Sequence, residues 1–117
     1  MEIKFFIQNL KLSDENKKFI EEKIKKLERF SEEIWEARVD LSYRPTRNKE
    51  QMIRLEINLR MPNKILRAEE KDRDLLNAIE KVEKKLKGQL RKYRTFGERK
   101  RKQTQKIIRK KKEELSS

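Results

Sequence analysis

The sequence contains no cysteine and no histidine among its 117 residues. Without cysteine there is neither a disulfide framework nor a thiolate zinc site, and without histidine the commonest general base is missing. Only two glycines are present, and they form no glycine-rich phosphate loop; no nucleophile motif is present either. Hydrolytic, redox and zinc chemistry therefore lack their usual groups, and we expect a protein that is not an enzyme and uses no metal or cofactor.

Long apolar runs are missing as well. No stretch approaches the ~20 residues that span a bilayer, and residues 1–10 lack the long apolar core and small-residue cleavage site of a signal peptide. We therefore expect a cytoplasmic protein. With 33% hydrophobic residues in 117, the chain affords one small domain with a modest core.

The residues present in excess are Lys and Arg. They number 34 against 21 Asp and Glu, which gives a net charge of +13. The excess grows along the chain, from +2 in residues 1–70 to +4 in residues 71–98 and +7 in residues 99–117. Such an excess attracts polyanions, which leaves nucleic acid, an anionic membrane surface and an acidic protein as candidate partners.

Alternating apolar and polar residues predict strands over residues 1–8, 35–43 and 53–61, with a shorter strand over residues 65–70. In the second of these, Trp35 is counted with the inward-facing residues, and in the first Phe6 is expected to pack outward. Residues 44–51 are polar, contain Pro45 and predict a loop, whereas residues 61–64 predict a tight turn.

Apolar residues at spacings of three and four predict two helices. The first runs from a Ser13 cap to about Phe30, and the second covers residues 72–94, with Asp72 or Asp74 as its cap. The whole pattern predicts an α+β fold of order β-α-β-β-β-α, in which a four-stranded sheet carries both helices on one face. The first helix is long enough to make the first two strands parallel, and the other strands form a meander.

Two helices side by side would bring their polar flanks together. The predicted basic surface contains Lys18, Lys25, Lys26, Arg29, Lys84, Lys85, Arg91 and Lys92. A solvated helix surface explains such a pattern equally well for either helix alone. Lys23 stands apart because it projects within the apolar stripe of the first helix. Either its stem packs on the core and its head reaches water, or its head is held towards an anionic ligand.

Residues 95–117 form a basic C-terminal tail that is expected to be disordered. Basic clusters at residues 99–102 and 109–112 flank a spacer whose only apolar anchors are Ile107 and Ile108. This segment holds too little apolar surface to fold alone. It is either a solubilising tail or an arm that becomes ordered along a phosphate backbone.

Three stretches, in this order, resemble one known family: FIEEKIKKLERF (residues 19–30), LRMPNKILRAEE (residues 59–70) and DLLNAIEKVEKKLKGQLRKYR (residues 74–94). They are similar to the ribosome hibernation promoting factor and ribosome-associated inhibitor family. The resemblance covers residues 1–94 and implies a ribosome-binding α/β domain similar in shape to double-stranded-RNA-binding domains. It further implies a short family form that binds the small ribosomal subunit under stress and blocks the transfer-RNA and messenger-RNA sites.

The resemblance also implies ribosomal-RNA contacts from the helix 1 lysine and the basic end of helix 2, which correspond to Lys23, Lys85, Gln89, Arg91, Lys92 and Arg94. To these we add Lys26, Arg29 and Lys84 from the predicted basic surface, and Arg99, Lys100, Arg101 and Lys102 as tail contacts. Two residues depart from the family pattern. Gly88 stands where a long polar or basic side chain is usual, and Leu76 where an aromatic residue is frequent.

The expected partners are thus the small subunit and its ribosomal RNA, with no membrane, no small-molecule substrate, and a monomer off the ribosome. Two other readings stay open. A general structured-RNA-binding protein or RNA chaperone would use the same basic surface without ribosome selectivity. A membrane-surface or acidic-partner protein would use the amphipathic second helix instead, although the sheet needs the apolar side of that helix.

Overall fold

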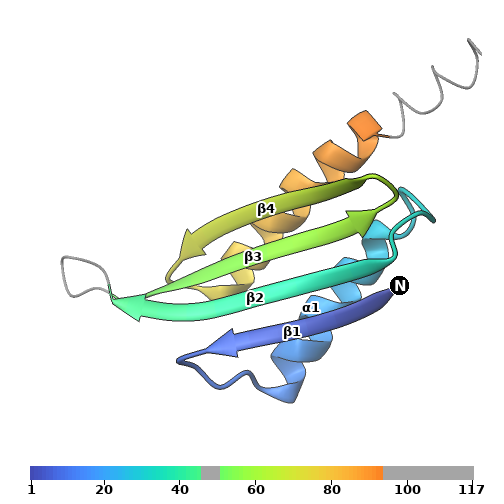
Figure 1. The fold of residues 1–117 in the computed structure, drawn as a ribbon. Helices are drawn as coiled ribbons and strands as arrows, with labels where there is room; N and C mark the ends of the chain where they lie inside the picture. The colour runs from blue at the N-terminus through green and yellow to red at the C-terminus, as the bar shows by residue number, and fades with distance from the viewer. Residues whose placement is uncertain (46–50, 94–117) are drawn as a thin grey trace, which may run out of the picture.

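The structure is a computed structural model, and it describes residues 1–45 and 51–93. Four strands form one mixed sheet in the order β1-β2-β3-β4 (Figure 1). They are β1 (Glu2–Gln8), β2 (Glu36–Pro45), β3 (Gln51–Met61) and β4 (Lys64–Asp72). β1 pairs with β2 in parallel, and the β2-β3 and β3-β4 pairs are antiparallel. The predicted α+β class, the parallel first pair and the meander are confirmed.

The first helix is α1 (Asp14–Leu27), and the predicted Ser13 cap is confirmed, since the Ser13 hydroxyl accepts a hydrogen bond from the Asn16 N–H at 3.2 Å. The helix ends earlier than expected. Residues 28–30 form a turn, in which the Phe30 N–H donates to the Leu27 carbonyl at 3.0 Å. Such i→i+3 bonds satisfy the last carbonyls of the helix and redirect the chain towards β2.

The second helix, called the C-terminal helix here, covers residues 75–93 of the described chain. Of the two predicted caps, Asp74 is the one used, because its Oδ1 accepts the Leu76 N–H at 3.0 Å. Asp72 is the last residue of β4, and its Oδ1 accepts the Asp74 N–H at 2.9 Å. The two aspartates therefore fix the turn from the sheet into the helix.

Both helices cover the same face of the sheet, and the other face is open (Figure 1). The core lies between the two layers, and the helices supply its outer half with Ile20, Ile24, Leu27, Ala78, Ile79, Val82, Leu86 and Leu90, all buried. The inward residues of β2, β3 and β4 supply the other half, from Ala37 to Ala68. The predicted helical stripes are confirmed in their central residues, while Leu75 and Tyr93 at the ends of the second stripe are only partly buried.

Three expectations about the strands are corrected. Trp35 is 59% exposed and precedes β2. Its backbone joins two strands, because its N–H donates to the Arg60 carbonyl at 2.8 Å and its carbonyl accepts the Glu2 N–H at 3.1 Å. The alternation of β2 therefore does not extend to Trp35, whose ring is largely exposed.

The predicted loop at residues 44–51 is too long, because β2 and β3 continue with Arg44 opposite Met52 and Pro45 opposite Gln51. This end of the hairpin carries mainly polar residues, so it shows no apolar alternation that would predict a strand. Residues 46–50 lie outside the described chain. β4 likewise extends to Asp72 rather than ending at residue 70. The tight turn after β3 is confirmed, with Asn63 at φ 59° after Pro62, a conformation that asparagine tolerates.

Candidate nucleic-acid interface

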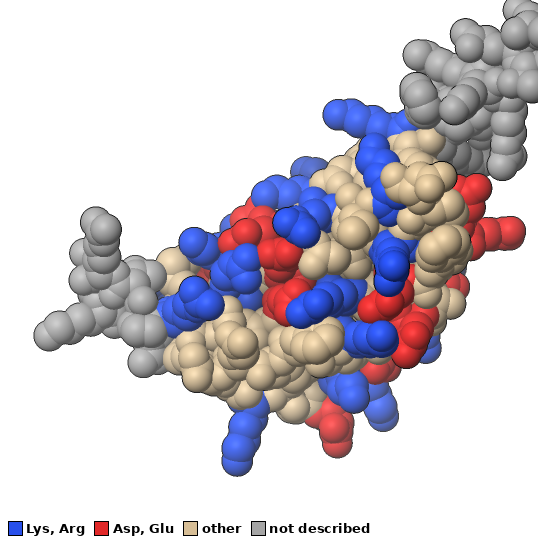
Figure 2. Space-filling model, viewed as in Figure 1, with Lys and Arg blue, Asp and Glu red and all other residues tan. Residues whose placement is uncertain are grey.

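The open face of the sheet carries charges of both signs, which Figure 2 shows interspersed over the strands. At its centre Arg54 bridges two carboxylates, with Nη2 2.6 Å from Glu56 Oε2 and Nε 2.8 Å from Glu69 Oε1. Arg67 adds a contact of 3.4 Å to Glu56 and a hydrogen bond of 2.8 Å to Asn58 Oδ1. This network matches each of these cations with an acid of the same face, so it offers a polyanion little uncompensated charge.

The same network shifts the ionisation of its members. The hydrogen bond from Arg54 lowers the pKa of the Glu69 carboxyl below its usual range, and the hydrogen bond to Glu69 raises the pKa of the Arg54 guanidinium. Both groups remain charged at neutral pH.

On the helical side, positive charge gathers at one end. Residues 23–30 hold four Lys or Arg and one Glu, whereas residues 14–22 hold two Lys and four acids. Residues 84–93 hold five Lys or Arg and no acid, whereas residues 74–83 hold one Lys and three acids. We call residues 23–30 and 84–93 together the cationic end of the helical layer.

Contacts between the helices show that these two segments are neighbours. Lys23 Nζ lies 3.6 Å from Glu83 Oε2, and the Arg91 guanidinium lies 5.6 Å from the centre of the Phe30 ring. Further along, the Tyr93 hydroxyl donates to Glu33 Oε2 at 2.7 Å. The helices are thus aligned in the same direction, with their C-terminal halves together (Figure 1).

Part of this asymmetry stabilises the helices themselves. A helix dipole favours acids in the first turn and cations in the last, and α1 carries Asp14 and Glu15 at its start and Lys25 and Lys26 at its end. The dipole acts only over the terminal turn. Cations such as Lys84 and Lys85, two turns before residue 93, are beyond its reach and need another explanation.

Lys23 combines features of both interpretations of its position. Its side chain is 23% exposed, and its ammonium lies at the rim of the core, 5.4 Å from the centre of the Phe19 ring. The same ammonium faces Glu83, whose other carboxylate oxygen lies 2.6 Å from Lys87 Nζ. One carboxylate therefore serves two ammonium groups from the two helices, and the trio keeps a charge of +1.

Lys85 and Gln89 lean towards β4. Lys85 Nζ lies 2.6 Å from Glu70 Oε1 and 3.1 Å from the Glu69 carbonyl oxygen, and the Gln89 amide donates to the Arg67 carbonyl at 2.8 Å. These contacts fasten the helix to the edge of the sheet. Both residues are positioned by the fold, and the charge of Lys85 is compensated by Glu70.

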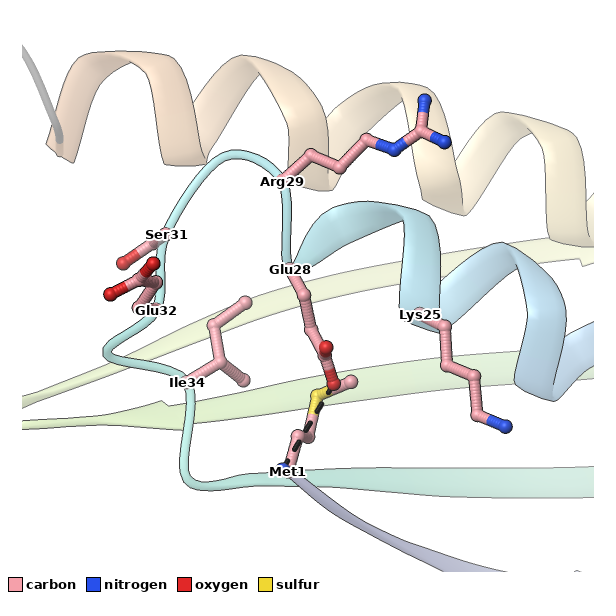
Figure 3. A pocket seen from close by; sticks show the side chains of 7 residues that line it. All are labelled: Met1, Lys25, Glu28, Arg29, Ser31, Glu32 and Ile34. Atoms are coloured by element: carbon pink, nitrogen blue, oxygen red, sulfur yellow. Dashed lines mark ion pairs between the residues drawn. The ribbon is translucent and has the colours of Figure 1, made fainter.

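Five exposed cations of the cationic end have no ion pair within residues 1–45 and 51–93. They are Lys25, Lys26, Arg29, Lys84 and Lys92. Arg29 and Lys25 point to different sides of α1 (Figure 3). Both residues line a pocket of about 380 Å³, together with Met1, Glu28, Ser31, Glu32 and Ile34. Arg94 and the tail residues Arg99 to Lys102 lie outside the described chain.

The described part of the chain shows few features of other kinds of site. It holds no cluster of acids suited to a metal ion. No helix within residues 1–45 and 51–93 is long and apolar enough to cross a membrane. The pocket beside Lys25 is lined by acids, cations and the apolar residues Met1 and Ile34, so it selects no class of ligand by charge.

Sequence reasoning missed the carboxylates that restrain the cations. Glu83 was recognisable in part, because its spacing from Lys87 is the i,i+4 spacing of a helical ion pair. The contact of Glu70 with Lys85 depends on how the helix crosses β4, which no local pattern in the sequence indicates. The positive sign of the helical surface was predictable from the sequence. Which of its cations are paired with carboxylates becomes clear only from the way the helices and the sheet pack.

The fold and the charges thus define an α+β domain with one cationic helical end and one sheet face that carries charges of both signs. Residues 3–96 match the family described as Sigma 54 modulation protein / S30EA ribosomal protein. The chain belongs to this family, and the resemblance found in its sequence is confirmed.

Among relatives, the chain is 39% identical over 88 residues to the ribosome hibernation promotion factor of Deinococcus radiodurans, and 36% identical over 87 residues to that of Staphylococcus aureus. The matched stretches cover 75% and 74% of this chain but only 46% and 45% of those proteins. The chain therefore spans less than half the length of the curated relatives that it matches.

Solved structures agree with the fold. The N-terminal domain of Thermus thermophilus Protein Y has a TM-score of 0.66 at 30% identity, and the similarity covers 80% of this chain and 99% of that domain. A ribosomal subunit interface protein from Coxiella burnetii has a TM-score of 0.68 at 20% identity, and the similarity covers 81% of this chain and 99% of that protein's chain. At that identity the second likeness shows the fold alone.

Proposed function

We propose that this protein is a ribosome hibernation factor that binds the small ribosomal subunit through the cationic end of its helical layer. Bound there, it blocks the transfer-RNA and messenger-RNA sites and silences idle ribosomes in the cytoplasm under stress. Membership of the family supports this proposal, as do the two relatives named ribosome hibernation promotion factor. No catalytic step is involved.

The observation that carries the proposal is the contrast between the two faces. On the open sheet face Arg54 and Arg67 contact Glu56 and Glu69, whereas Lys26, Arg29, Lys84 and Lys92 on the helical side have no acidic partner in the described chain. An RNA phosphate gains most where no acid of the protein already holds the cation. The helical side is thus the surface that suits RNA.

Recognition of this kind relies on shape and charge. Structured RNA presents a wide, shallow groove and its phosphates, which proteins read mainly without base contacts. The rigid pair of helices supplies a fixed spacing of cations, and a cleft of matching shape in ribosomal RNA supplies selectivity. Inhibition then needs only occupancy, because transfer RNA cannot enter a site that the protein fills.

A direct test compares two double charge reversals. Lys84→Glu with Lys92→Glu removes two exposed cations of the helical side. Arg60→Glu with Lys71→Glu makes the same change in net charge at two exposed residues on the open face of β3 and β4, neither of which has an ion pair in the described chain. Binding to purified small subunits should fall strongly for the first variant and little for the second, with unchanged circular dichroism. Equal losses would reduce the proposal to attraction by net charge.

Salt dependence and competitor RNA separate ribosome binding from general RNA binding. If six to ten phosphates are contacted, affinity should fall by roughly 10³ to 10⁵ between about 50 and 200 mM salt by the duplex rule. Small subunits should bind more tightly than free duplex RNA at matched salt. Equal affinity for both would favour a general RNA-binding protein, and salt-resistant binding to anionic vesicles would favour a membrane-surface protein.

A further inference from the structure

Gly88 lies in the interior of the C-terminal helix and is exposed. Glycine destabilises a helix interior relative to alanine, because the free chain loses more conformational freedom there. No glycine among the described residues has a positive φ, and a Cβ built at Gly88 meets no atom within 4 Å. Neither backbone conformation nor packing within residues 1–45 and 51–93 therefore demands glycine at this position.

The position faces away from the sheet. Leu86 and Leu90 are fully buried, and each is two residues from Gly88. Two residues on a helix are separated by about 200°, so Gly88 points almost opposite to both. The peptide backbone at Gly88 is thus exposed on the side of the helix that faces away from the sheet, where a partner could contact it.

The four nearest neighbours of Gly88 on the helix surface are all cationic residues. On a helix surface the neighbours of a residue are those three and four positions away, with Cβ atoms about 5–6 Å apart. For Gly88 these are Lys84, Lys85, Arg91 and Lys92, and all four are exposed. Because Gly88 has no side chain, it leaves a gap on the helix surface between these four residues, which we call a notch.

We propose that this notch, which we call the Gly88 notch, holds one phosphate group of an RNA backbone. The inference rests on the proposed function, which supplies the RNA, and it adds the place and the reason for a glycine. Any side chain at residue 88 would fill the notch and hold the phosphate further from the four cations. Lys84 and Lys92 are available to it, while the contacts of Lys85 with Glu70 and of Arg91 with Phe30 fix two of the four cations.

The backbone N–H groups of a helix interior are already used in i→i−4 bonds. The phosphate is therefore held by the side-chain cations and by close contact with the backbone at Gly88, without hydrogen bonds to the peptide. Affinity should depend on the size of residue 88 rather than on its polarity. This size dependence distinguishes the notch from a simple gain or loss of charge.

Three variants test the notch: Gly88→Ala, Gly88→Gln and the control Asn77→Ala. Asn77 is exposed, lies on the same helix and, eleven residues away, points within about 20° of Gly88. Both alanine variants should raise the melting temperature of the free protein, because alanine is the better helix former. Binding to small subunits should weaken from Gly88→Ala to Gly88→Gln, while Asn77→Ala binds like the original protein.

The salt dependence of the affinity for small subunits is a second measurement, and a change in helix stability alone does not alter it. Loss of one phosphate contact should reduce the slope of log affinity against log salt by about one in Gly88→Gln. If the original protein binds subunits and both Gly88 variants keep its affinity and slope, the notch is refuted and the proposed function stands.

If the original protein does not bind subunits, the proposed function fails, and the same three variants are measured on a short RNA duplex. A graded loss there would still support the notch, whereas equal binding, or no binding of the original protein, would refute it.

Discussion

The carboxylate of Glu83 joins the two helices through two lysines, with Oε2 3.6 Å from Lys23 Nζ and Oε1 2.6 Å from Lys87 Nζ. The Glu83 side chain is only 11% exposed, and its Oε2 atom has no hydrogen bond in the described chain. Glu83 therefore both fixes the alignment of the helices and withdraws charge from the surface proposed to bind RNA.

Replacing Glu83 by Gln should separate these two effects. The free energy of unfolding should fall by about 1 kcal/mol, because a partly buried ion pair between the helices is lost. Affinity for small subunits should rise several-fold at low salt, since two ammonium groups gain freedom to meet phosphates, and the gain should shrink as salt screens them. Thermal unfolding and subunit co-sedimentation measure the two quantities.

The matched control is Glu80→Gln, which makes the same charge change at an exposed residue of the same helix that has no ion pair in the described chain. It should affect affinity less than Glu83→Gln does. A fall in affinity for Glu83→Gln would mean that the glutamate positions Lys23 for RNA rather than competing with RNA for it.

A second prediction concerns the packing that aligns the helical layer. Leu86 is fully buried between the C-terminal helix and the sheet, whereas Leu76 on the same helix is 43% exposed. Leu86→Ala should cost about 2–5 kcal/mol, because it removes apolar contacts and leaves a cavity, and Leu76→Ala should cost well under that. Urea unfolding measures the free energy of unfolding of the two variants. Similar losses of stability in both would show that the buried side of the helix is assigned wrongly.

Acid should destabilise the protein through Glu69 and Asp72. The pKa of Glu69 is lowered by the hydrogen bond from Arg54, and the pKa of Asp72 is lowered by the Asp74 N–H and by Lys81. A carboxyl with a lowered pKa in the folded state contributes stability above its unfolded pKa and loses it as pH falls through the folded pKa. Stability should therefore decline below about pH 4, near the ordinary carboxyl values.

The basic partners define the opposite limit. Hydrogen bonding to Asp72 raises the pKa of the Lys81 ammonium in the folded state. The contribution of Lys81 to folding stability is therefore complete below its unfolded pKa. It is lost only as the pH rises through the folded pKa, above about pH 10. Melting temperatures across pH should show a plateau between these limits. Glu69→Gln and Asp72→Asn should flatten the acid limb; an acid limb as steep as the original would assign acid sensitivity to other groups.

The strands and helices were largely predictable because their signals are local. Alternation located the strands and the three-four spacing located the helices, and the buried residues Leu55, Val82 and Leu86 are those that the patterns placed inside. The predictions failed at the ends of the strands, where the apolar alternation and the strand do not coincide. Trp35 continues the alternation of β2 in the sequence, but it precedes the strand and is largely exposed. At the other end, Arg44 and Pro45 continue the pairing with β3 without an apolar alternation to indicate it.

The candidate site was predictable in sign but not in detail. Counting charges along each helix, rather than around it, would have located the cationic end from the sequence. The contact of Lys23 with Glu83 joins residues sixty positions apart, and it depends on the parallel alignment of the two helices. No local pattern encodes that alignment, which arises from how both helices pack on one twisted sheet.

The basic tail provides the last prediction. Residues 99–117 carry an excess of +7, and we propose that they extend the contact with RNA along the messenger path through Arg99, Lys100, Arg101 and Lys102. Deleting residues 99–117 should lower affinity for small subunits and reduce its salt dependence, because fewer phosphates are neutralised, while the melting temperature stays the same. Replacing only these four residues by Gln should reproduce most of the loss if this cluster makes the contact. Unchanged affinity and unchanged inhibition of translation after the deletion would restrict RNA binding to the folded domain and leave the tail a solubilising role.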